Sequence, residues 1–394
     1  MDGGVLTSVL VITLVAALAP PAADLLNRWL PVPSTVLEIV LGILVGPAVL
    51  GLASLDDVVE GLATFGLALL FFLAGYEVNY GRIRGRPLRG ALLSWGASLL
   101  LGLAAGGLLA AVLGGGGATA VALGLALATS ALGTILPTVR DAGLLPTPLG
   151  ARIMAVGAVG EFVPIVAVAL ILGGQRPLHA SVLLAGFAAV AITAVGLASA
   201  RTPAVLTRLM SVTLSTSAQF AIRLSLLVVV ALVWLAVELH LDLVLGAFAA
   251  GVVVRQLLSS ISVRETEVIE SKLEAVGYGV LIPIFFVATG VGFDLDSLLG
   301  SASALALVPI GVVAFLLVRG VPVGVAFRRQ LPPRQLAALS LYAATALPLV
   351  VVITQIGVRN DWLSSAHAAG LVGAAMLSVL VCPLAAQRLY HPDR

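Results

Sequence analysis

Residues 154–172 read MAVGAVGEFVPIVAVALIL, a run long enough to cross a lipid bilayer that holds one ionisable side chain, Glu161. A charged carboxylate in hydrocarbon is costly unless it is protonated, paired or hydrated. Ionisable side chains inside membrane spans commonly mark ion or proton routes. The run therefore predicts a membrane helix with a functional acid. The alternative is a permanently neutral carboxyl group that hydrogen-bonds a neighbouring helix.

The rest of the chain has the composition of an integral membrane protein. Of the 394 residues, 60% are hydrophobic and 10% are charged, and the mean hydropathy is +1.15. The formal net charge of +2 gives no reason to expect a nucleic-acid partner. The single cysteine, Cys382, excludes an internal disulfide framework and a multi-cysteine metal site.

Apolar runs of spanning length recur along the chain, and we count about thirteen of them. They begin near Val5, Val32, Val58, Gly90, Ala118, Arg152, Leu178, Ala218, Leu243, Ala275, Ala304, Gln335 and Ala366. No connection is long enough for a water-soluble domain. We therefore expect an all-α polytopic membrane protein, with residues 1–394 forming a single transmembrane unit without a soluble regulatory domain.

The basic residues predict the orientation. Assigning alternate connections to one side gathers most of the 21 basic residues there, leaving Arg176 and Arg359 on the other side and Arg319 within a span. Under the positive-inside rule the crowded side is cytoplasmic. We expect a multi-pass protein of the plasma (inner) membrane, with its N-terminus outside and its C-terminus in the cytoplasm.

Two spans carry breaks at related places. Residues 118–143 contain Thr129–Pro137, which reads TSALGTILP, and residues 335–357 contain Ala343–Pro348, which reads AATALP. In each, small and hydroxyl residues precede a proline that cannot donate to the helix ladder. Paired breaks in two halves are typical of inverted-repeat transporters, which bind their substrate between the half-helices. We expect two crossed broken helices, non-helical at these segments; the alternative is a pair of ordinary proline kinks.

Four further stretches resemble motifs of the monovalent cation:proton antiporter family, which holds bacterial sodium/proton and potassium/proton exchangers. They are Leu30–Gly51 with its central Glu38, Phe71–Glu77 (FFLAGYE), Leu245–Gly251 (LGAFAAG) and Pro283–Gly290 (PIFFVATG). The resemblance implies a sodium/proton antiporter-like fold of about 13 helices, with inverted repeats and a core domain that contains the two broken helices. It also implies a homodimer.

The same resemblance assigns roles to two residues. Glu161 falls where such antiporters keep the acid that binds the cation and the proton in turn. Arg319 falls where they place a basic residue facing that acid, which makes it the expected ion-pair partner; the alternative is an arginine that snorkels towards the cytoplasm. The family usually has Asp, Asn or Gln immediately before its acid, whereas this chain has Gly160. The site has one side-chain ligand fewer, and its acid is one methylene longer than the usual Asp.

Oxygen atoms near the breaks are candidate ligands for a monovalent cation. Carboxylate and hydroxyl oxygens suit Na+ and K+. Together with Glu161, the candidates are Thr129, Ser130, Thr134 and Thr345. The alternative for each hydroxyl is a hydrogen bond within or between helices.

Two functions remain open from the sequence. The first is electroneutral exchange of Na+ or K+ for a proton by alternating access at Glu161, a transporter and not an enzyme. The second is an antiporter fold repurposed as an organic-ion carrier or as a membrane-embedded enzyme with Glu161 as acid or base, because Gly160 leaves room for a larger substrate. The chain has no phosphate-binding glycine loop, so we expect no cofactor.

Overall fold

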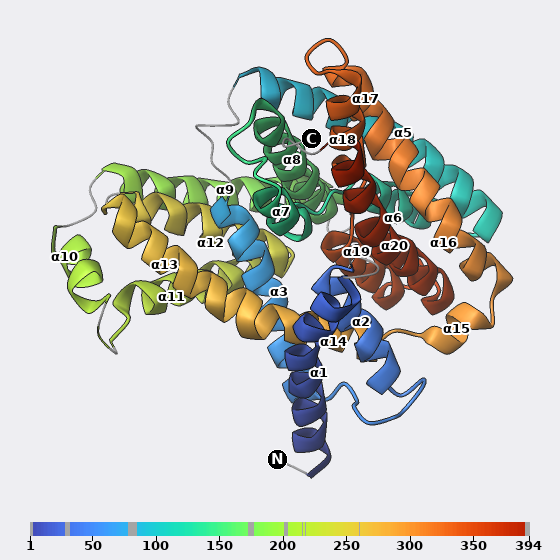
Figure 1. Cartoon of the computed structure of the whole chain (residues 1–394), viewed down its shortest axis with the longest axis horizontal. Helices are drawn as coiled ribbons and strands as arrows, with labels where there is room; N and C mark the ends of the chain where they lie inside the picture. The colour runs from blue at the N-terminus through green and yellow to red at the C-terminus, as the bar shows by residue number, and fades with distance from the viewer. Residues whose placement is uncertain are drawn as a thin grey trace. The chain divides into compact units, whose positions relative to one another are not determined.

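The computed structural model describes residues 3–27, 32–77, 85–171, 177–200, 204–214, 216, 218–259 and 261–390 (Figure 1). These residues form helices and contain no strand, so the predicted all-α fold is confirmed. Some basic residues used to predict the orientation, and Leu30 and Pro31 of the first antiporter-like motif, lie outside the described residues. The basic residues concerned are Arg28, Arg82, Arg84, Arg176, Arg201 and Arg394.

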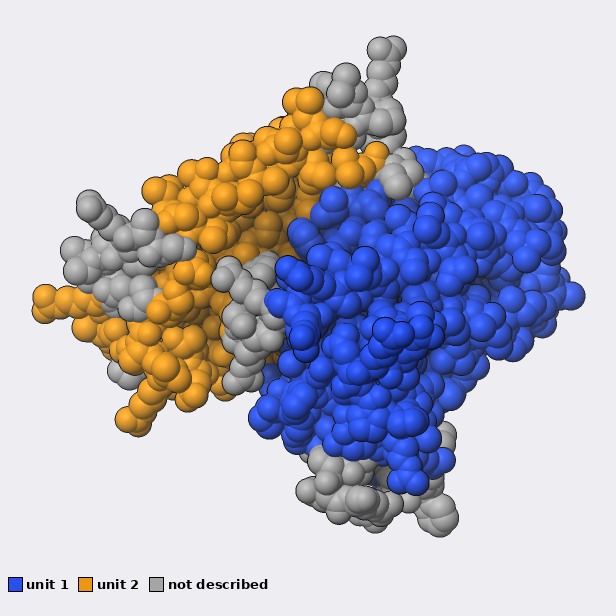
Figure 2. Space-filling model, turned by 90° about the horizontal axis from the view of Figure 1, so that it is seen from above, with its two compact units in different colours: residues 1–56, 80–168, 286–394 blue, residues 57–79, 169–285 orange. Residues whose placement is uncertain are grey.

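The chain divides into two compact units, coloured blue and orange in Figure 2. Unit 1 comprises Met1–Asp56, Tyr80–Val168 and Phe286–Arg394, and unit 2 comprises Asp57–Asn79 and Ala169–Phe285. The helices of unit 1 are α1 (Gly3–Asn27), α2 (Ser34–Val45), α5 (Arg86–Leu113), α6 (Gly117–Leu127), α7 (Leu132–Asp141), most of α8 (Pro148–Ile171), α15 (Leu295–Leu299), α16 (Ala302–Phe315), the π-helical segment η2 (Leu316–Gly320), α17 (Val321–Phe327), α18 (Pro333–Ala343), α19 (Pro348–Arg359) and α20 (Ser365–Leu389). Those of unit 2 are α3 (Asp57–Glu77), α9 (Pro177–Ala200), α10 (Ala204–Thr213), α11 (Phe220–Glu238), α12 (Leu243–Leu258), α13 (Val263–Val276) and the π-helical segment η1 (Gly277–Leu281), while α14 (Ile282–Val291) belongs in part to each unit.

Most of these helices have membrane character. Within the described residues, ten helical stretches are long and apolar enough to cross a membrane. Three shorter apolar helices accompany them: Ser34–Val45, Ser181–Leu197 and Leu243–Leu258. The polytopic architecture is confirmed, whereas the count of thirteen crossings and the single exchanger unit without a soluble domain stay predictions.

In unit 2, α3 and α12 pack closely. A Cβ atom on Gly75 would collide with the Phe248 carbonyl oxygen, and one on Gly251 would collide with that of Phe72. Near the end of this contact, Arg255 Nη1 donates to the Tyr76 carbonyl oxygen at 2.5 Å, and the guanidinium lies over the Tyr76 ring. Small residues thus allow close backbone approach, as in other membrane helix pairs.

In unit 1, α5 positions the first broken helix. A Cβ atom on Gly102 would lie 2.5 Å from the Gly124 carbonyl oxygen, and one on Gly124 would lie 2.8 Å from that of Gly102. Both distances are shorter than real carbon atoms allow, so the two glycines permit this approach. Farther along the pair, Trp95 Nε1 donates to the Ala128 carbonyl oxygen at 3.2 Å, where α6 has just ended.

The two breaks are held together by hydrogen bonds. Residues 128–131 separate α6 from α7, and residues 344–347 separate α18 from α19. The Ala131 N–H donates to the Thr345 carbonyl oxygen at 2.8 Å, and the Ser130 hydroxyl donates to the Ala343 carbonyl oxygen at 2.5 Å. The polar backbone that each break frees is therefore satisfied partly by the other break. We call these two four-residue segments the crossing.

The first break is shorter than the sequence predicted. Leu132–Pro137 was expected to be non-helical, yet this stretch lies in α7. A proline inside a helix removes one backbone hydrogen bond but does not have to end the helix, and the bonds that replace the ladder begin upstream, at Ser130 and Ala131. The second break is shorter than predicted by one residue at each end, because Ala343 is the last residue of α18 and Pro348 is the first residue of α19, where a backbone N–H would have no helical acceptor.

Candidate functional site

The side chain of Glu161 contacts the N-terminus of the half-helix α7. Glu161 itself belongs to α8 and is 2% exposed. Its Oε2 accepts a hydrogen bond at 3.1 Å from the backbone N–H of Leu132, the first residue of α7. First-turn N–H groups lack acceptors within their own helix and carry the positive end of its dipole. Glu161 therefore caps α7 from a neighbouring helix, and this position favours negative charge.

Arg319 lies within the π-helical segment η2 and is fully buried. Its Nε and Nη2 donate to Ser130 Oγ at 2.9 and 2.8 Å, its Nη1 donates to Ser98 Oγ at 3.3 Å, and its Nη2 also donates to the Val156 carbonyl oxygen at 3.3 Å. Within the described residues, no hydrogen bond or ion pair joins Arg319 to Glu161. In this conformation the guanidinium is held by neutral oxygens, and the expected ion pair stays a prediction.

Ser130 connects Arg319 to the second broken helix. Its hydroxyl accepts two N–H groups of Arg319 and donates its proton to the Ala343 carbonyl oxygen at the C-terminal end of α18. Its backbone N–H donates to the Gly160 carbonyl oxygen at 2.8 Å. Carbonyl groups at a helix C-terminus carry the negative end of the dipole. A negative group thus faces the N-terminus of one half-helix, and a positive group is linked to the C-terminus of another.

The other predicted hydroxyl ligands bond within their own segments. Thr129 Oγ1 donates to Ala126 at 2.8 Å, Thr134 Oγ1 to Ala131 at 3.1 Å and Thr345 Oγ1 to Leu341 at 3.2 Å, in each case to the carbonyl oxygen. The hydroxyls of these three threonines keep acceptor lone pairs, whereas both lone pairs of Ser130 Oγ face Arg319. The role of all four hydroxyls as cation ligands stays a prediction.

Several residues of the site had no signal in the sequence. Ser98 is fully buried and bonds Arg319, and Ser378 is fully buried and bonds the Ala346 N–H at 3.1 Å in the second break. Trp95 bonds the first break. These residues come from uninterrupted apolar runs, where a lone serine or tryptophan is common. The π-helical segment that carries Arg319 also has no sequence signature, although such segments are frequent at functional sites.

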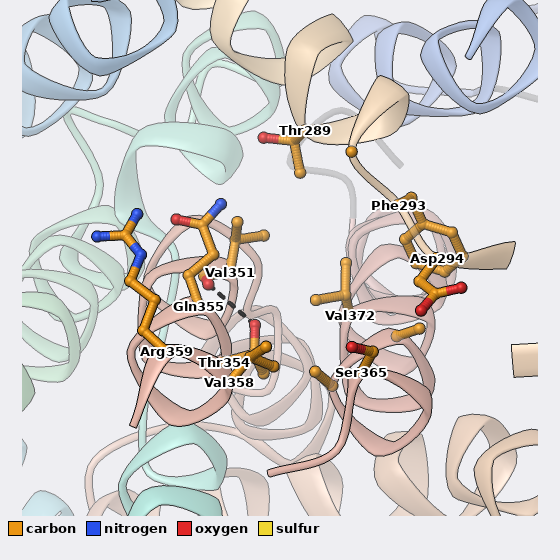
Figure 3. Close-up of a pocket in the computed structure, with 13 residues that line it drawn as sticks. Thr289, Phe293, Asp294, Val351, Thr354, Gln355, Val358, Arg359, Ser365 and Val372 are labelled. Carbon is orange, nitrogen blue, oxygen red and sulfur yellow. Dashed lines mark hydrogen bonds between the residues drawn. The ribbon is translucent and has the colours of Figure 1, made fainter. Parts of the chain in front are cut away.

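A separate cavity of about 250 Å³ lies along α19 and the start of α20 (Figure 3). Gln355, Arg359 and Asp294 contribute polar groups to its wall, and Val351 and Val372 contribute apolar ones. None of the predicted site residues lines it. Val351 follows Pro348, the first residue of α19, by about 4.5 Å of helix rise, so the cavity ends roughly one turn from the crossing.

Comparison with known proteins finds sodium/proton antiporters. A family model described as a transmembrane sodium/hydrogen exchanger matches residues 10–390. YjbQ of Bacillus subtilis (strain 168), whose name refers to a Na(+)/H(+) antiporter, is 30% identical over 175 residues, which are 44% of this chain and 27% of YjbQ. GerN of Bacillus cereus, named a Na(+)/H(+)-K(+) antiporter, is 22% identical over 291 residues, which are 70% of this chain and 69% of GerN.

A solved structure shows the same fold. The sodium proton antiporter MjNhaP1 from Methanocaldococcus jannaschii, solved at pH 8, matches with a TM-score of 0.72 over 97% of this chain and 95% of its own, at 15% sequence identity. The predicted antiporter-like fold and the predicted family are both confirmed. Because the family model extends over nearly all of its spans, the chain belongs to the transmembrane sodium/hydrogen exchanger family.

Proposed function

We propose that this protein exchanges Na+ or K+ for a proton at Glu161 by alternating access, without net movement of charge. The observation that carries the proposal is the buried Glu161 carboxylate at the N-terminus of α7. A carboxylate in that position can be neutralised by a proton or by a small cation, but not by both together. The name of GerN, which refers to both Na+ and K+, supports either cation as substrate.

The half-helix α7 assists the ionised form of the acid. The Leu132 N–H and the dipole of α7 stabilise the ionised carboxylate. After the proton leaves and before a cation binds, they therefore offset part of the negative charge of Glu161. Thr129, Thr134 and Thr345 hold hydroxyl oxygens close to the crossing, where they complete the coordination of the cation. A neutralised Glu161 lowers the electrostatic cost of the conformational change that moves the site between the two sides of the membrane.

The charge balance follows from two neighbours of the acid. Gly160 offers no titratable group, and Arg319 keeps its proton because a guanidinium is not deprotonated under physiological conditions. One acid then carries either one proton or one monovalent cation. We expect a homodimer in the plasma membrane with its N-terminus outside, so that Arg359 and the cavity beside it face the exterior.

Exchange in everted membrane vesicles tests the assignment of Glu161. With a dye that reports the proton gradient, Na+ or K+ should dequench the wild-type signal, and the response should fall at acid pH because protons outcompete cations for the carboxylate. Glu161→Gln should abolish the response, since an amide cannot exchange a proton. Glu60→Gln, which changes an exposed acid in the first turn of α3, is the control and should keep it. If Glu161→Gln keeps pH-dependent exchange, the carrier is another group.

The stoichiometry has its own test in reconstituted proteoliposomes. Exchange of one proton for one cation moves no net charge, so its rate should not respond to a membrane potential set by valinomycin and K+ during a Na+ assay. A clear change in rate with the imposed potential would contradict electroneutral exchange and would require a second titrating group.

A further inference from the structure

Gly160 has no room for a side chain. A Cβ atom there would collide with Arg319 Nη2 and would lie 2.8 and 2.9 Å from Ser130 Oγ and Cβ. Real Cβ atoms essentially never approach other heavy atoms so closely. The volume next to Glu161 that a side chain at position 160 would enter is therefore already filled by the guanidinium of Arg319 and the side chain of Ser130.

The guanidinium sits in a socket of neutral oxygens. Ser130 Oγ, Ser98 Oγ and the Val156 carbonyl oxygen accept its four hydrogen bonds, and all three residues are at most 2% exposed. We call these three oxygens the guanidinium socket. Burying a cation is costly unless its donors are paired, and pairing by neutral oxygens leaves the positive charge itself uncompensated within the socket.

We propose that the guanidinium socket is a second cation site beside Glu161, permanently occupied by the chain's own Arg319, and that Gly160 keeps it open. The site takes a guanidinium or a similarly small monovalent cation that can donate hydrogen bonds. It comes from three separate elements: Ser98 from α5, Ser130 from the crossing and Val156 from α8.

The socket has a consequence for specificity, which rests on the exchange function proposed above. A side chain at position 160 and Arg319 in the socket exclude each other. While Arg319 occupies the socket, no side chain from position 160 can add a second titratable group beside Glu161, and the carrier site keeps one acid for one external cation. Residue 160 is thus a specificity-determining position that acts through the placement of Arg319.

Chemical rescue tests the socket without any transport measurement. Arg319→Ala empties it, and the melting temperature of the purified variant is recorded with millimolar guanidinium or with tetramethylammonium, which has the same charge but no N–H donors. Guanidinium alone should raise the melting temperature of Arg319→Ala by several degrees and should leave the wild type unchanged or slightly lower. Adding Ser130→Ala should remove this rise. No rise with guanidinium, or an equal rise with tetramethylammonium or in the double variant, would overturn the proposal.

A second experiment tests the mutual exclusion of Arg319 and a side chain at position 160. Gly160→Ala should lower the melting temperature of the wild type by more than it lowers that of Arg319→Ala or Arg319→Lys, because the clash with Ser130 is common to all three and the clash with the guanidinium is present only in the wild type. Gly107→Ala is the control, because a Cβ atom at this position in α5 meets nothing within 4 Å. Arg319→Lys keeps the test open if Arg319→Ala does not fold.

Equal losses from Gly160→Ala in all three backgrounds would contradict the proposal. The melting temperatures are measured without an ion gradient. A failed rescue therefore counts against the socket, whereas a failed vesicle assay counts against cation/proton exchange.

Discussion

The two breaks of the crossing have the same length but different chemistry. At the first, residues 128–131, an acid caps the following half-helix and an arginine bonds Ser130. At the second, residues 344–347, the partners are neutral: the Ser378 hydroxyl bonds Ala346, and Pro348 begins the next half-helix without needing an acceptor. The comparison teaches that the first break carries the charged chemistry, while the second supplies backbone groups that hold the first in place.

Ser130→Ala, at the first break, should have the largest effect on stability and on exchange. Its removal leaves the Ala343 carbonyl oxygen and two N–H groups of a buried guanidinium without their partner. Losing a hydrogen-bond partner of a buried charge costs about 3 kcal/mol or more. We expect a clear drop in melting temperature together with loss of exchange in vesicles. Wild-type stability in Ser130→Ala would mean that Arg319 does not depend on this hydroxyl.

Ser378→Ala should have a smaller effect at the second break. The side chain is buried and bonds only neutral groups, the Ala346 N–H and the Ala346 and Ala375 carbonyl oxygens. A neutral hydrogen bond between membrane helices is worth about 1 kcal/mol. We expect a modest loss of thermal stability in detergent and exchange that retains its wild-type dependence on pH. A shifted pH profile would show that the second break also controls the carrier acid.

Pro348→Ala should have the smallest effect. At the first position of α19 the added N–H has no helical acceptor to gain, so the change acts mainly by loosening the unfolded chain. We expect the free energy of unfolding to fall by less than about 1 kcal/mol. Thermal unfolding checks this, and a loss as large as that of Ser130→Ala would mean that the proline itself maintains the break.

The sequence predicted those parts of the site whose residue types are unusual for a membrane helix. An acid in an apolar run marked Glu161, and hydroxyl residues before a proline marked both breaks. The predicted length of the first break was wrong because Pro137 is tolerated inside α7. Hydrogen bonds to the region of the second break, more than 200 residues away, decide where α7 begins. The partners of Arg319 could not be predicted, because Ser98 and Ser130 reach it from other spans and a π-helical segment sets its direction.

The Ser130 hydroxyl has one proton, and the structure leaves it one direction. Both lone pairs are engaged by Arg319, so the proton must point to Ala343. The direction of these hydrogen bonds is fixed, because the Ser130 hydroxyl could turn its proton away from Ala343 only if an N–H group of Arg319 gave up its bond to Ser130 Oγ. A guanidinium cannot accept a proton, so the chain from Arg319 through Ser130 to α18 does not conduct protons. If Glu161 exchanges protons as proposed, their route does not run along this chain of hydrogen bonds.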